Sequence, residues 1–234
     1  MNIFLDIETI PTERQDVRDY IAAGISPPGN ISKAETIAKW NEESRPGAID
    51  EAVNKTGLDG AFGRVCVACF AVDDQPVERI SSATNESGLL MALSIRLDQE
   101  VLTSLFTTVI VGHNVSSFDL RFLVQRYIVN GIKPPPVIAR AAQAKPWEIE
   151  KVFDTMTQWA GVGGRVSLDK LCLALGIESP KGEIDGSKVG QYVQDGKIAE
   201  VVEYCVKDVE ATREIWRRMT FQMVGAVEFQ DVPA

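Results

Sequence analysis

The sequence predicts an α/β fold in which helices flank a mixed five-stranded sheet, with three antiparallel and then two parallel strands. Three observations support this fold. Three strand-like runs come first, strand–helix units follow them, and three helical segments close the chain. Hairpin connections favour antiparallel pairing early in the chain, whereas crossovers favour parallel pairing later. We therefore expect helices on both faces of the sheet.

The first strand, expected at residues 2–8, places two carboxylates in an apolar run. Side chains on a strand alternate between its two faces. One face would carry Ile3, Leu5 and Ile7, and the other Phe4, Asp6 and Glu8. An unpaired carboxylate in apolar surroundings is costly, so something must offset the burial of Asp6 and Glu8.

The remaining elements follow in order. Residues 10–63 are polar and interrupted by Pro and Gly, which predicts a helical insertion after the first strand. Its short helices are expected at about 12–23 and 33–55. Further strands are expected at about 64–73, 77–82, 107–114 and 151–156, and helices at about 86–105, 118–130, 167–177, 185–193 and 197–220. Residues 1–220 would form a single domain and residues 221–234 a tail.

The composition is typical of a globular protein, with 45% apolar and 24% charged residues. No signal-peptide pattern opens the sequence and no apolar run approaches the ~20 residues of a membrane span, so we expect a cytoplasmic protein without a membrane partner. The net charge of −9 has the wrong sign for a protein that grips duplex nucleic acid with a basic stripe. Either the partner is not nucleic acid, or contact is short and mediated by cations.

Four cysteines invite a metal or redox interpretation, which the pattern does not favour. Cys66 and Cys69 form a CxxC, but in a strand-like run, where positions i and i+3 point to opposite faces. Neither a second CxxC nor a nearby histidine completes a zinc ligand set. Cys172 and Cys205 fall on expected helices and are interpreted as small apolar fillers.

Four acidic residues are expected to converge. Asp6 and Glu8 share one face of the first strand. Asp119 begins a helix after the turn GHNVSSFD, and Asp208 lies one helical turn after Tyr204. Clustered carboxylates repel one another unless a cation lies among them. Oxygen ligands without sulfur or imidazole are typical of Mg²⁺ or Mn²⁺, which we expect to offset the charges of the first strand.

Three short motifs resemble those of the DEDD 3′–5′ exonucleases: DIET at 6–9, HNVSSFD at 113–119 and YCVKD at 204–208. The YxxxD spacing resembles the tyrosine branch, DEDDy, because the other branch needs a histidine where this chain has Glu203. Asn114 followed by Phe118 and Asp119, together with SLDKLCLALGI, GSKVGQYV and YCVKDVEATREIW, resembles the exonucleases related to the proofreading domain of family-B DNA polymerases. The stretch from PPGN through ETIAKW to LDGAFGRV is similar to stand-alone members found in bacteria and phages. The resemblance spans nearly the whole chain, apart from the last dozen residues, and implies a ribonuclease H-like fold.

The resemblance also implies a reaction: hydrolysis of phosphodiester bonds at 3′ ends with two divalent cations, Mg²⁺ or Mn²⁺. Asp6, Glu8 and Asp208 would ligate the cation that activates water. Asp6 would bridge to the second cation, which Asp119 would hold directly or through waters. Tyr204 would orient the attacking water. Glu8, or a nearby backbone amide, would contact the terminal 3′-hydroxyl.

Several other residues near these motifs are candidates for substrate binding or for supporting the site. Asn114 either bonds the terminal nucleotide or caps its turn, and Phe118 either stacks on a base or fills the core. Thr9 is a third substrate-binding candidate. His113 is interpreted as a satisfied turn residue, and Asp154 as either a support for the site or a helix cap. Residues of the insertion that either grip a single strand or form ordinary surface are Lys33, Lys39, Trp40, Lys55, Phe62 and Arg64.

The expected substrate is the 3′ end of single-stranded or frayed DNA, cut into nucleoside monophosphates. The alternatives are an RNA 3′-end exonuclease and a ribonuclease H-like module that binds nucleic acid without cutting it. A small-molecule phosphatase is a weaker alternative, because the sequence has no glycine-rich loop that would cradle a phosphate. A polymerase or a replication or repair protein, acting in trans, is a further expected partner.

Overall fold

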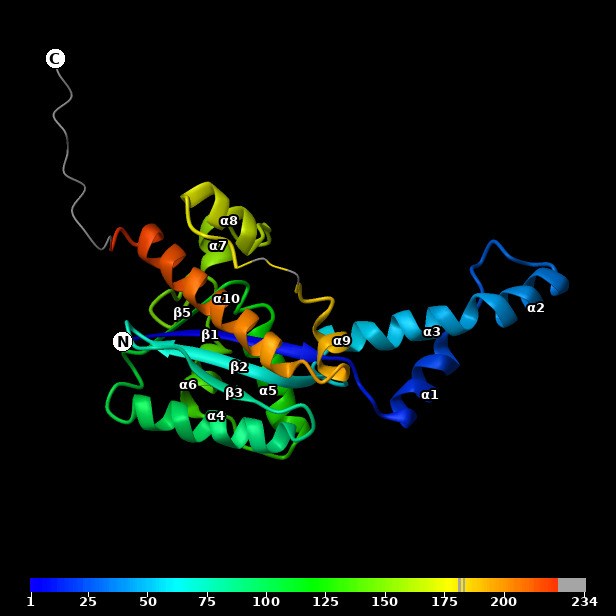
Figure 1. Cartoon of the computed structure of the whole chain (residues 1–234), viewed down its shortest axis with the longest axis horizontal. Helices are drawn as coiled ribbons and strands as arrows, with labels where there is room; N and C mark the ends of the chain where they lie inside the picture. Colours follow the sequence, from blue (N-terminus) through cyan, green and yellow to red (C-terminus); the bar gives the residue numbers. More distant parts are fainter. Residues whose placement is uncertain (181, 183, 223–234) are drawn as a thin grey trace, which may run out of the picture.

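A five-stranded sheet forms the centre of the computed structural model, which describes residues 1–180, 182 and 184–222. Its strands are β1 (Asn2–Ile10), β2 (Arg64–Val72), β3 (Glu78–Ser81), β4 (Val109–Gly112) and β5 (Val152–Asp154). They lie in the order β3-β2-β1-β4-β5 (Figure 1). β2 pairs antiparallel with β1 and β3, whereas β4 pairs parallel with β1 and β5. The predicted mixed sheet is confirmed.

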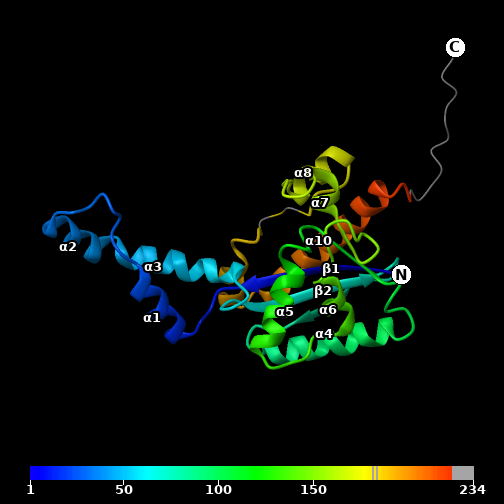
Figure 2. The ribbon, with the colours of Figure 1, turned by 180° about the vertical axis from the view of Figure 1, so that it is seen from behind.

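Helices cover both faces of this sheet, as the views from the two sides show (Figures 1 and 2). One face is covered by α4 (Glu86–Val101), α5 (Asp119–Val129) and α6 (Pro136–Ala141), and the other by α9 (Val189–Gln194) and α10 (Ile198–Met219). The short helices α7 (Thr155–Ala160) and α8 (Leu168–Leu175) contact α10. Among the described residues, no helix combines the length and apolar character that a membrane crossing needs.

The alternation predicted for the first strand is confirmed in β1. Ile3, Leu5 and Ile7 are buried in the core beneath α4 and α5. Phe4 points to the opposite side and meets Trp216 of α10 edge-on, with ring centroids 5.4 Å apart. Every second side chain of β1 therefore faces α10.

A β-bulge interrupts the pairing of β1 with β2 beside Glu8. Glu8 pairs with Val67, but the next residue, Thr9, pairs with Val65, so Cys66 is the extra residue. The bulge turns Cys66 onto the α10 face, where Cys69 also lies. The expectation that the two CxxC cysteines point to opposite faces is wrong, because that expectation assumed an unbroken strand.

The insertion forms an arm that extends beyond the end of β1 (Figures 1 and 2). It holds α1 (Gln15–Gly24), α2 (Ala34–Glu43), α3 (Arg45–Asn54) and the 3₁₀ turn η1 (Lys55–Leu58). The helical region expected at about 33–55 is two helices that meet at Ser44, with Pro46 in the first turn of α3, where its missing N–H costs nothing. The arm returns to the sheet at η1, where the Thr9 hydroxyl donates to Gly57 O over 2.6 Å.

The structure adds two six-residue helices that the sequence analysis does not predict. α6 begins at Pro136, between the helix expected at about 118–130 and the strand expected at about 151–156. The strand expected at 151–156 ends two residues early, because α7 begins directly after Asp154. The Asp154 side chain caps α7 by accepting a hydrogen bond from Met156 N at 3.0 Å. The helix expected to reach residue 105 ends at Val101. Residues 223–234 of the expected tail lie outside the described part of the chain.

Candidate active site

The four acidic residues predicted to converge do meet, beside the second half of β1. Asp6 and Glu8 lie on the β1 face that α10 covers. Asp119, the first residue of α5, accepts a hydrogen bond from the Ile7 backbone N–H over 3.1 Å. Asp208 of α10 is near enough to act electrostatically on both Asp6 and Glu8. One strand and two helices thus bring together carboxylates from both ends of the sequence.

Burial and mutual repulsion raise the pKa values of this carboxylate cluster. Glu8, Asp119 and Asp208 are only 7%, 3% and 9% exposed, so few water molecules can solvate their charges. Burial, and then the charges of Asp119, Asp208 and Glu8, raise the pKa of Asp6 well above its usual range. Burial raises the pKa of Glu8 in the same way. It raises the pKa values of Asp119 and Asp208 to about 7 each. The ionised cluster is therefore unfavourable on its own.

No protein cation balances this cluster. Within residues 1–180, 182 and 184–222, no Lys or Arg forms an ion pair with any of the four acids. Glu86 shows the opposite arrangement: it is equally buried but lies 2.7 Å from the Arg126 guanidinium. In addition, Asp208 Oδ1 is buried and has no hydrogen-bond partner. Divalent cations fit the cluster, because they would supply both the charge and the missing partner.

Tyr204 lies next to the cluster, one turn before Asp208 on α10. Its side chain is near enough to the Asp208 carboxylate to lower the pKa of Asp208 against the effect of burial. Burial, and then the charges of Asp208 and Glu8, raise the pKa of Tyr204 above its usual value, so the phenol keeps its proton. A cavity of about 230 Å³ opens onto Tyr204 and Asp208. Glu203, at the position where the other branch would need a histidine, forms an ion pair with Arg79 of β3.

The turn that carries the second motif is held by Asp154. Both Asp154 oxygens accept from this turn, Oδ1 from Asn114 N and Oδ2 from Ser116 N, each at 3.0 Å. Asp154 also caps α7, so it both supports the site and caps a helix. Gly112 precedes the turn, and a larger residue does not fit there because its Cβ would lie 2.5 Å from the Cβ of Val115. Asn114 takes a left-handed conformation with φ of 62° and thereby shapes the turn.

His113 is the satisfied turn residue that the sequence predicts. Its Nε2 donates to Val166 O at 3.0 Å, since a carbonyl only accepts, and its Nδ1 then accepts from the Thr155 hydroxyl at 2.9 Å. Burial lowers the pKa of His113, which keeps the ring neutral. The ring therefore stabilises the turn and is not available to the carboxylates.

The remaining substrate-binding candidates differ in what they contact. The Asn114 side chain has no hydrogen bond with a described residue that would occupy its amide. Phe118 is half-buried and packs on Phe122, with ring centroids 5.5 Å apart, so it fills part of the core. Thr9 lines a cavity of about 610 Å³ between the arm and α9. Thr9 is the residue that follows Glu8 in β1.

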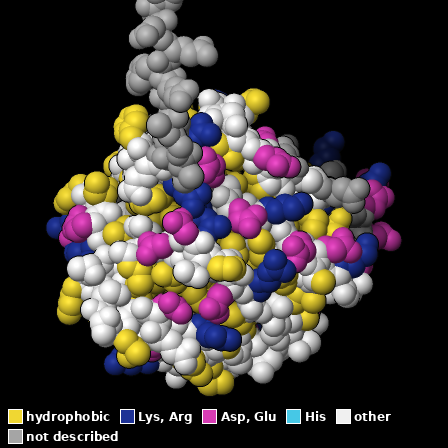
Figure 3. All heavy atoms as spheres, turned by 60° about the vertical axis from the view of Figure 1, so that its left-hand side comes forward, with side chains coloured by type: hydrophobic (Ala, Val, Ile, Leu, Met, Phe, Trp, Pro, Cys, Tyr) yellow, Lys and Arg dark blue, Asp and Glu magenta, His cyan; other side chains and the backbone are white. Residues whose placement is uncertain are grey.

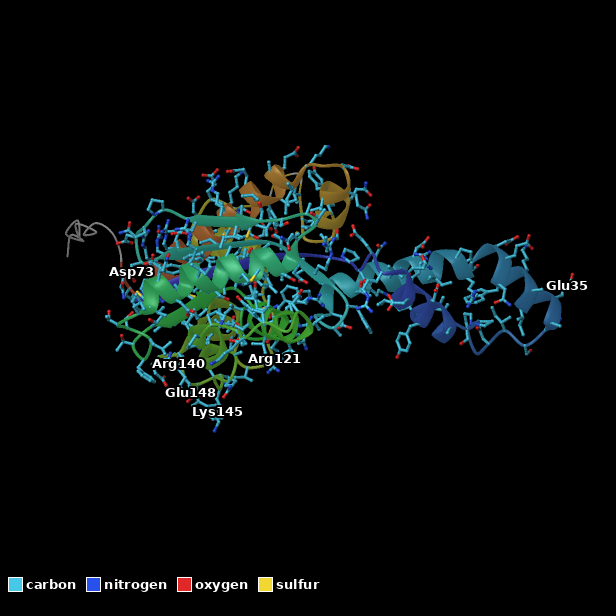
Figure 4. All side chains as sticks on the ribbon, turned by 90° about the horizontal axis from the view of Figure 1, so that it is seen from below. Glu35, Asp73, Arg121, Arg140, Lys145 and Glu148 are labelled. Atoms are coloured by element: carbon cyan, nitrogen blue, oxygen red, sulfur yellow. The ribbon has the colours of Figure 1, made fainter. Side chains whose placement is uncertain are left out.

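Several charged residues of the arm and of its junction with β2 form ion pairs. Lys39, Lys55 and Arg64 form ion pairs with Glu43, Glu51 and Glu13. Figure 3 shows acidic and basic side chains interspersed over the end of the molecule opposite the arm. Figure 4 shows Glu35 at the far end of the arm, with Arg121, Arg140 and Lys145 scattered along the α5–α6 side of the body. These views give no sign of a continuous basic stripe.

Cys205 lies closer to the carboxylates than its interpretation as an apolar filler implies. It is fully buried, as expected of a filler, but its thiol also donates to Asp6 Oδ2 over 3.2 Å. The position could have been found from helical spacing, because Cys205 precedes Asp208 by three residues and so lies on nearly the same face of α10. Cys172, in contrast, is buried among apolar residues between α8 and α10, as expected.

Comparisons with known proteins place this geometry in a family. Residues 61–232 match the family model described as a predicted 3′–5′ exonuclease related to the exonuclease domain of PolB. The match extends into the expected tail but does not include DIET at 6–9, which the structure brings to the other motifs. Among the curated proteins no match was found.

The fold has a counterpart among solved structures. The family B DNA polymerase from the hyperthermophilic archaeon Pyrobaculum calidifontis matches with a TM-score of 0.57 and 16% sequence identity. The alignment covers 94% of this chain but 24% of the polymerase chain, so this protein corresponds to about a quarter of that enzyme. The likeness and the mixed sheet support the expected ribonuclease H-like fold. Because the family model matches well over half of the residues, the chain belongs to the predicted 3′–5′ exonucleases related to the PolB exonuclease domain.

Proposed function

We propose that this protein is a divalent-metal-dependent exonuclease that removes nucleoside monophosphates from the 3′ end of single-stranded or frayed DNA. One observation carries the proposal: in the described part of the chain, four carboxylates converge without a Lys or Arg partner, and one buried oxygen, Asp208 Oδ1, has no hydrogen-bond partner. Such a cluster is unfavourable when empty, but it matches the oxygen ligands that Mg²⁺ or Mn²⁺ prefer.

The cluster divides naturally between two cations. Asp6, Glu8 and Asp208 would hold one, and Asp6 with Asp119 the other. When bound, the cations would lower the pKa of the attacking water and stabilise the charge on the leaving 3′ oxygen. The Ile7 N–H bond to Asp119 Oδ1 orients this carboxylate and leaves Oδ2 for a ligand. Asp154 fixes the turn in front of Asp119, so the helix that carries this acid starts at a defined place.

Tyr204 would position the water rather than remove its proton. The raised pKa keeps its phenol neutral at the pH of the cell, which excludes a role as general base. A neutral hydroxyl can donate to one oxygen and accept from another. It can therefore orient the water against the scissile phosphate while it bonds Asp208.

The substrate strand would leave the cluster past Thr9 and Asn114. The cavity that Thr9 lines has a volume of about 610 Å³, and the Asn114 amide, which bonds no described residue, would bind a terminal base or sugar. Because the net charge is −9, few phosphates would be contacted. In a plot of the logarithm of the affinity against the logarithm of the salt concentration, the slope should then correspond to fewer than about three phosphate contacts.

The test is cleavage of a 5′-labelled oligonucleotide with Mg²⁺ or Mn²⁺. Single-stranded DNA, a 3′-mismatched duplex and RNA are compared side by side, and stepwise shortening of the DNA from its 3′ end is expected. Asp6→Asn should abolish the ladder, whereas Asp98→Asn, an exposed acid on α4, should leave it unchanged. Faster trimming of RNA would assign the RNA alternative. Binding without cleavage of any substrate in either metal would favour a non-catalytic module.

A further inference from the structure

Cys205 belongs to the carboxylate cluster by geometry, not only by sequence position. One ligand atom from each of Asp6, Glu8 and Cys205 lies within 4.8 Å of the others. The Cys205 sulfur is 3.2 Å from Asp6 Oδ2 and 3.5 Å from Asp6 O. In a tetrahedral zinc site with one sulfur ligand, neighbouring ligand atoms are roughly 3.3–3.8 Å apart. Small side-chain movements would therefore bring all three to one cation.

Asp208 supplies a second, independent indication of a ligand. Its Oδ1 atom is buried without a hydrogen-bond partner, and the residue is 9% exposed. The charge of Asp208 acts on both Asp6 and Glu8, so the carboxylate shares their space. Asp208 is outside the group of Asp6, Glu8 and Cys205 whose ligand atoms lie within 4.8 Å of one another, so its side chain would have to turn toward the cation to serve as a fourth ligand.

We propose that Cys205 gives this centre a second metal-binding mode, in which Zn²⁺ or Cd²⁺ binds the Cys205 sulfur together with the Asp6 and Glu8 carboxylates and blocks the hard cations. Sulfur selects such borderline or soft cations over Mg²⁺ and Mn²⁺. On binding, the S–H bond breaks, a sulfur–metal bond forms, and the proton passes to water. The consequence, a nuclease silenced by zinc, rests on the proposed function; the binding mode itself does not.

Binding is tested on metal-stripped full-length protein with Cd²⁺ as the probe. The ultraviolet thiolate-to-cadmium charge-transfer band should appear in the wild type and in Cys172→Ala, whose thiol lies among apolar side chains at α8. Cys205→Ser keeps a hydroxyl that can donate to Asp6, and it should lose the band. For Asp6→Asn, the midpoint of the Cd²⁺ titration should rise by at least about 10-fold.

The same titrations can overturn the binding mode. Absence of the band in the wild type, an undiminished band in Cys205→Ser, or an unchanged midpoint in Asp6→Asn would each do so. Circular dichroism checks folding, and Cys205→Ala replaces Cys205→Ser if the latter does not fold.

Inhibition is measured separately, with each variant compared with its own Mg²⁺-supported cleavage rate. The wild type should lose cleavage at a zinc concentration about 10-fold below that needed by Cys205→Ser. Equal sensitivity would overturn the inhibitory consequence. If the protein cuts no nucleic acid with Mg²⁺ or Mn²⁺, the proposed function fails, whereas the cadmium band still decides the binding mode.

Discussion

Replacing Asp119 with Asn should stabilise the metal-free protein, although Asp119 is almost fully buried. The physical reason is the raised pKa. Burial raises the pKa of Asp119 from 3.8 to about 7, so the folded state holds its proton more tightly than the unfolded state. The stabilisation from this proton is complete below pH 3.8 and is lost as the pH rises to about 7.

The magnitude follows from the two pKa values. At about 1.4 kcal/mol for each pH unit between them, ionised Asp119 costs up to about 4 kcal/mol above pH 7. The amide of the Asp119→Asn variant carries no charge and keeps an oxygen that can accept from Ile7 N. The variant should therefore gain about 2–4 kcal/mol at pH 8, because relaxation of the site removes part of the full cost. At pH 5 the gain should shrink to about a third, since most of the penalty has not yet accrued.

The assay is urea unfolding in EDTA at pH 5 and pH 8, followed by circular dichroism. Glu86→Gln is the matched control, since Glu86 is buried to a similar degree but pairs with Arg126. It should lose about 3 kcal/mol at both pH values, because Arg126 would be left buried without its partner. A less stable Asp119→Asn protein at pH 8, or a gain of the same size at pH 5, would refute the reasoning.

Three further predictions concern the metal, the tyrosine and the turn. Mg²⁺ should raise the midpoint of thermal unfolding more at pH 8 than at pH 5.5, because the ligands must lose their protons, and Asp6→Asn should reduce this rise; equal shifts in calorimetry would contradict it. Tyr204→Phe should lower kcat by about 100-fold with little change in KM, since the hydroxyl orients water rather than substrate; a loss under 3-fold in single-turnover cleavage would argue against this role. Asp154→Ala should cost about 2–4 kcal/mol in urea unfolding, because the backbone N–H groups of the turn and of α7 lose their acceptor, while Asp154→Asn should cost less; an unaltered midpoint would show that water replaces the carboxylate.

The parts of the fold that repeat a simple period could be predicted from the sequence. The alternation of Ile3, Phe4 and Leu5 fixes which face of β1 meets α10, and that face carries Asp6 and Glu8. The spacing of Tyr204 and Asp208 predicts their shared helical face in the same way. The acids converge because the second half of β1, the start of α5 and the middle of α10 meet.

The parts that depend on a single tertiary contact could not be predicted. α7 is too short for a helical period to be visible, and it begins where it does because Asp154 caps it. Helical spacing places Cys205 on the face of Asp208, but its contact with Asp6 joins residues 199 positions apart and is not specified by that spacing. The boundary between α2 and α3 at Ser44 depends on how the arm folds back, which the polar composition of the insertion does not specify.

The extra residue in β2 places two consecutive side chains, Cys66 and Val67, on the same face of the sheet. A substitution at Cys66 would change one side chain beside Glu8, whose backbone carbonyl accepts from the Cys66 thiol. Deletion of Cys66 would close the bulge and leave Val67 on the α10 face and Val65 in the opposite core, because adjacent strand residues alternate between faces. The deletion would thus keep the pairing on both sides of the bulge and remove only the thiol that donates to the Glu8 carbonyl.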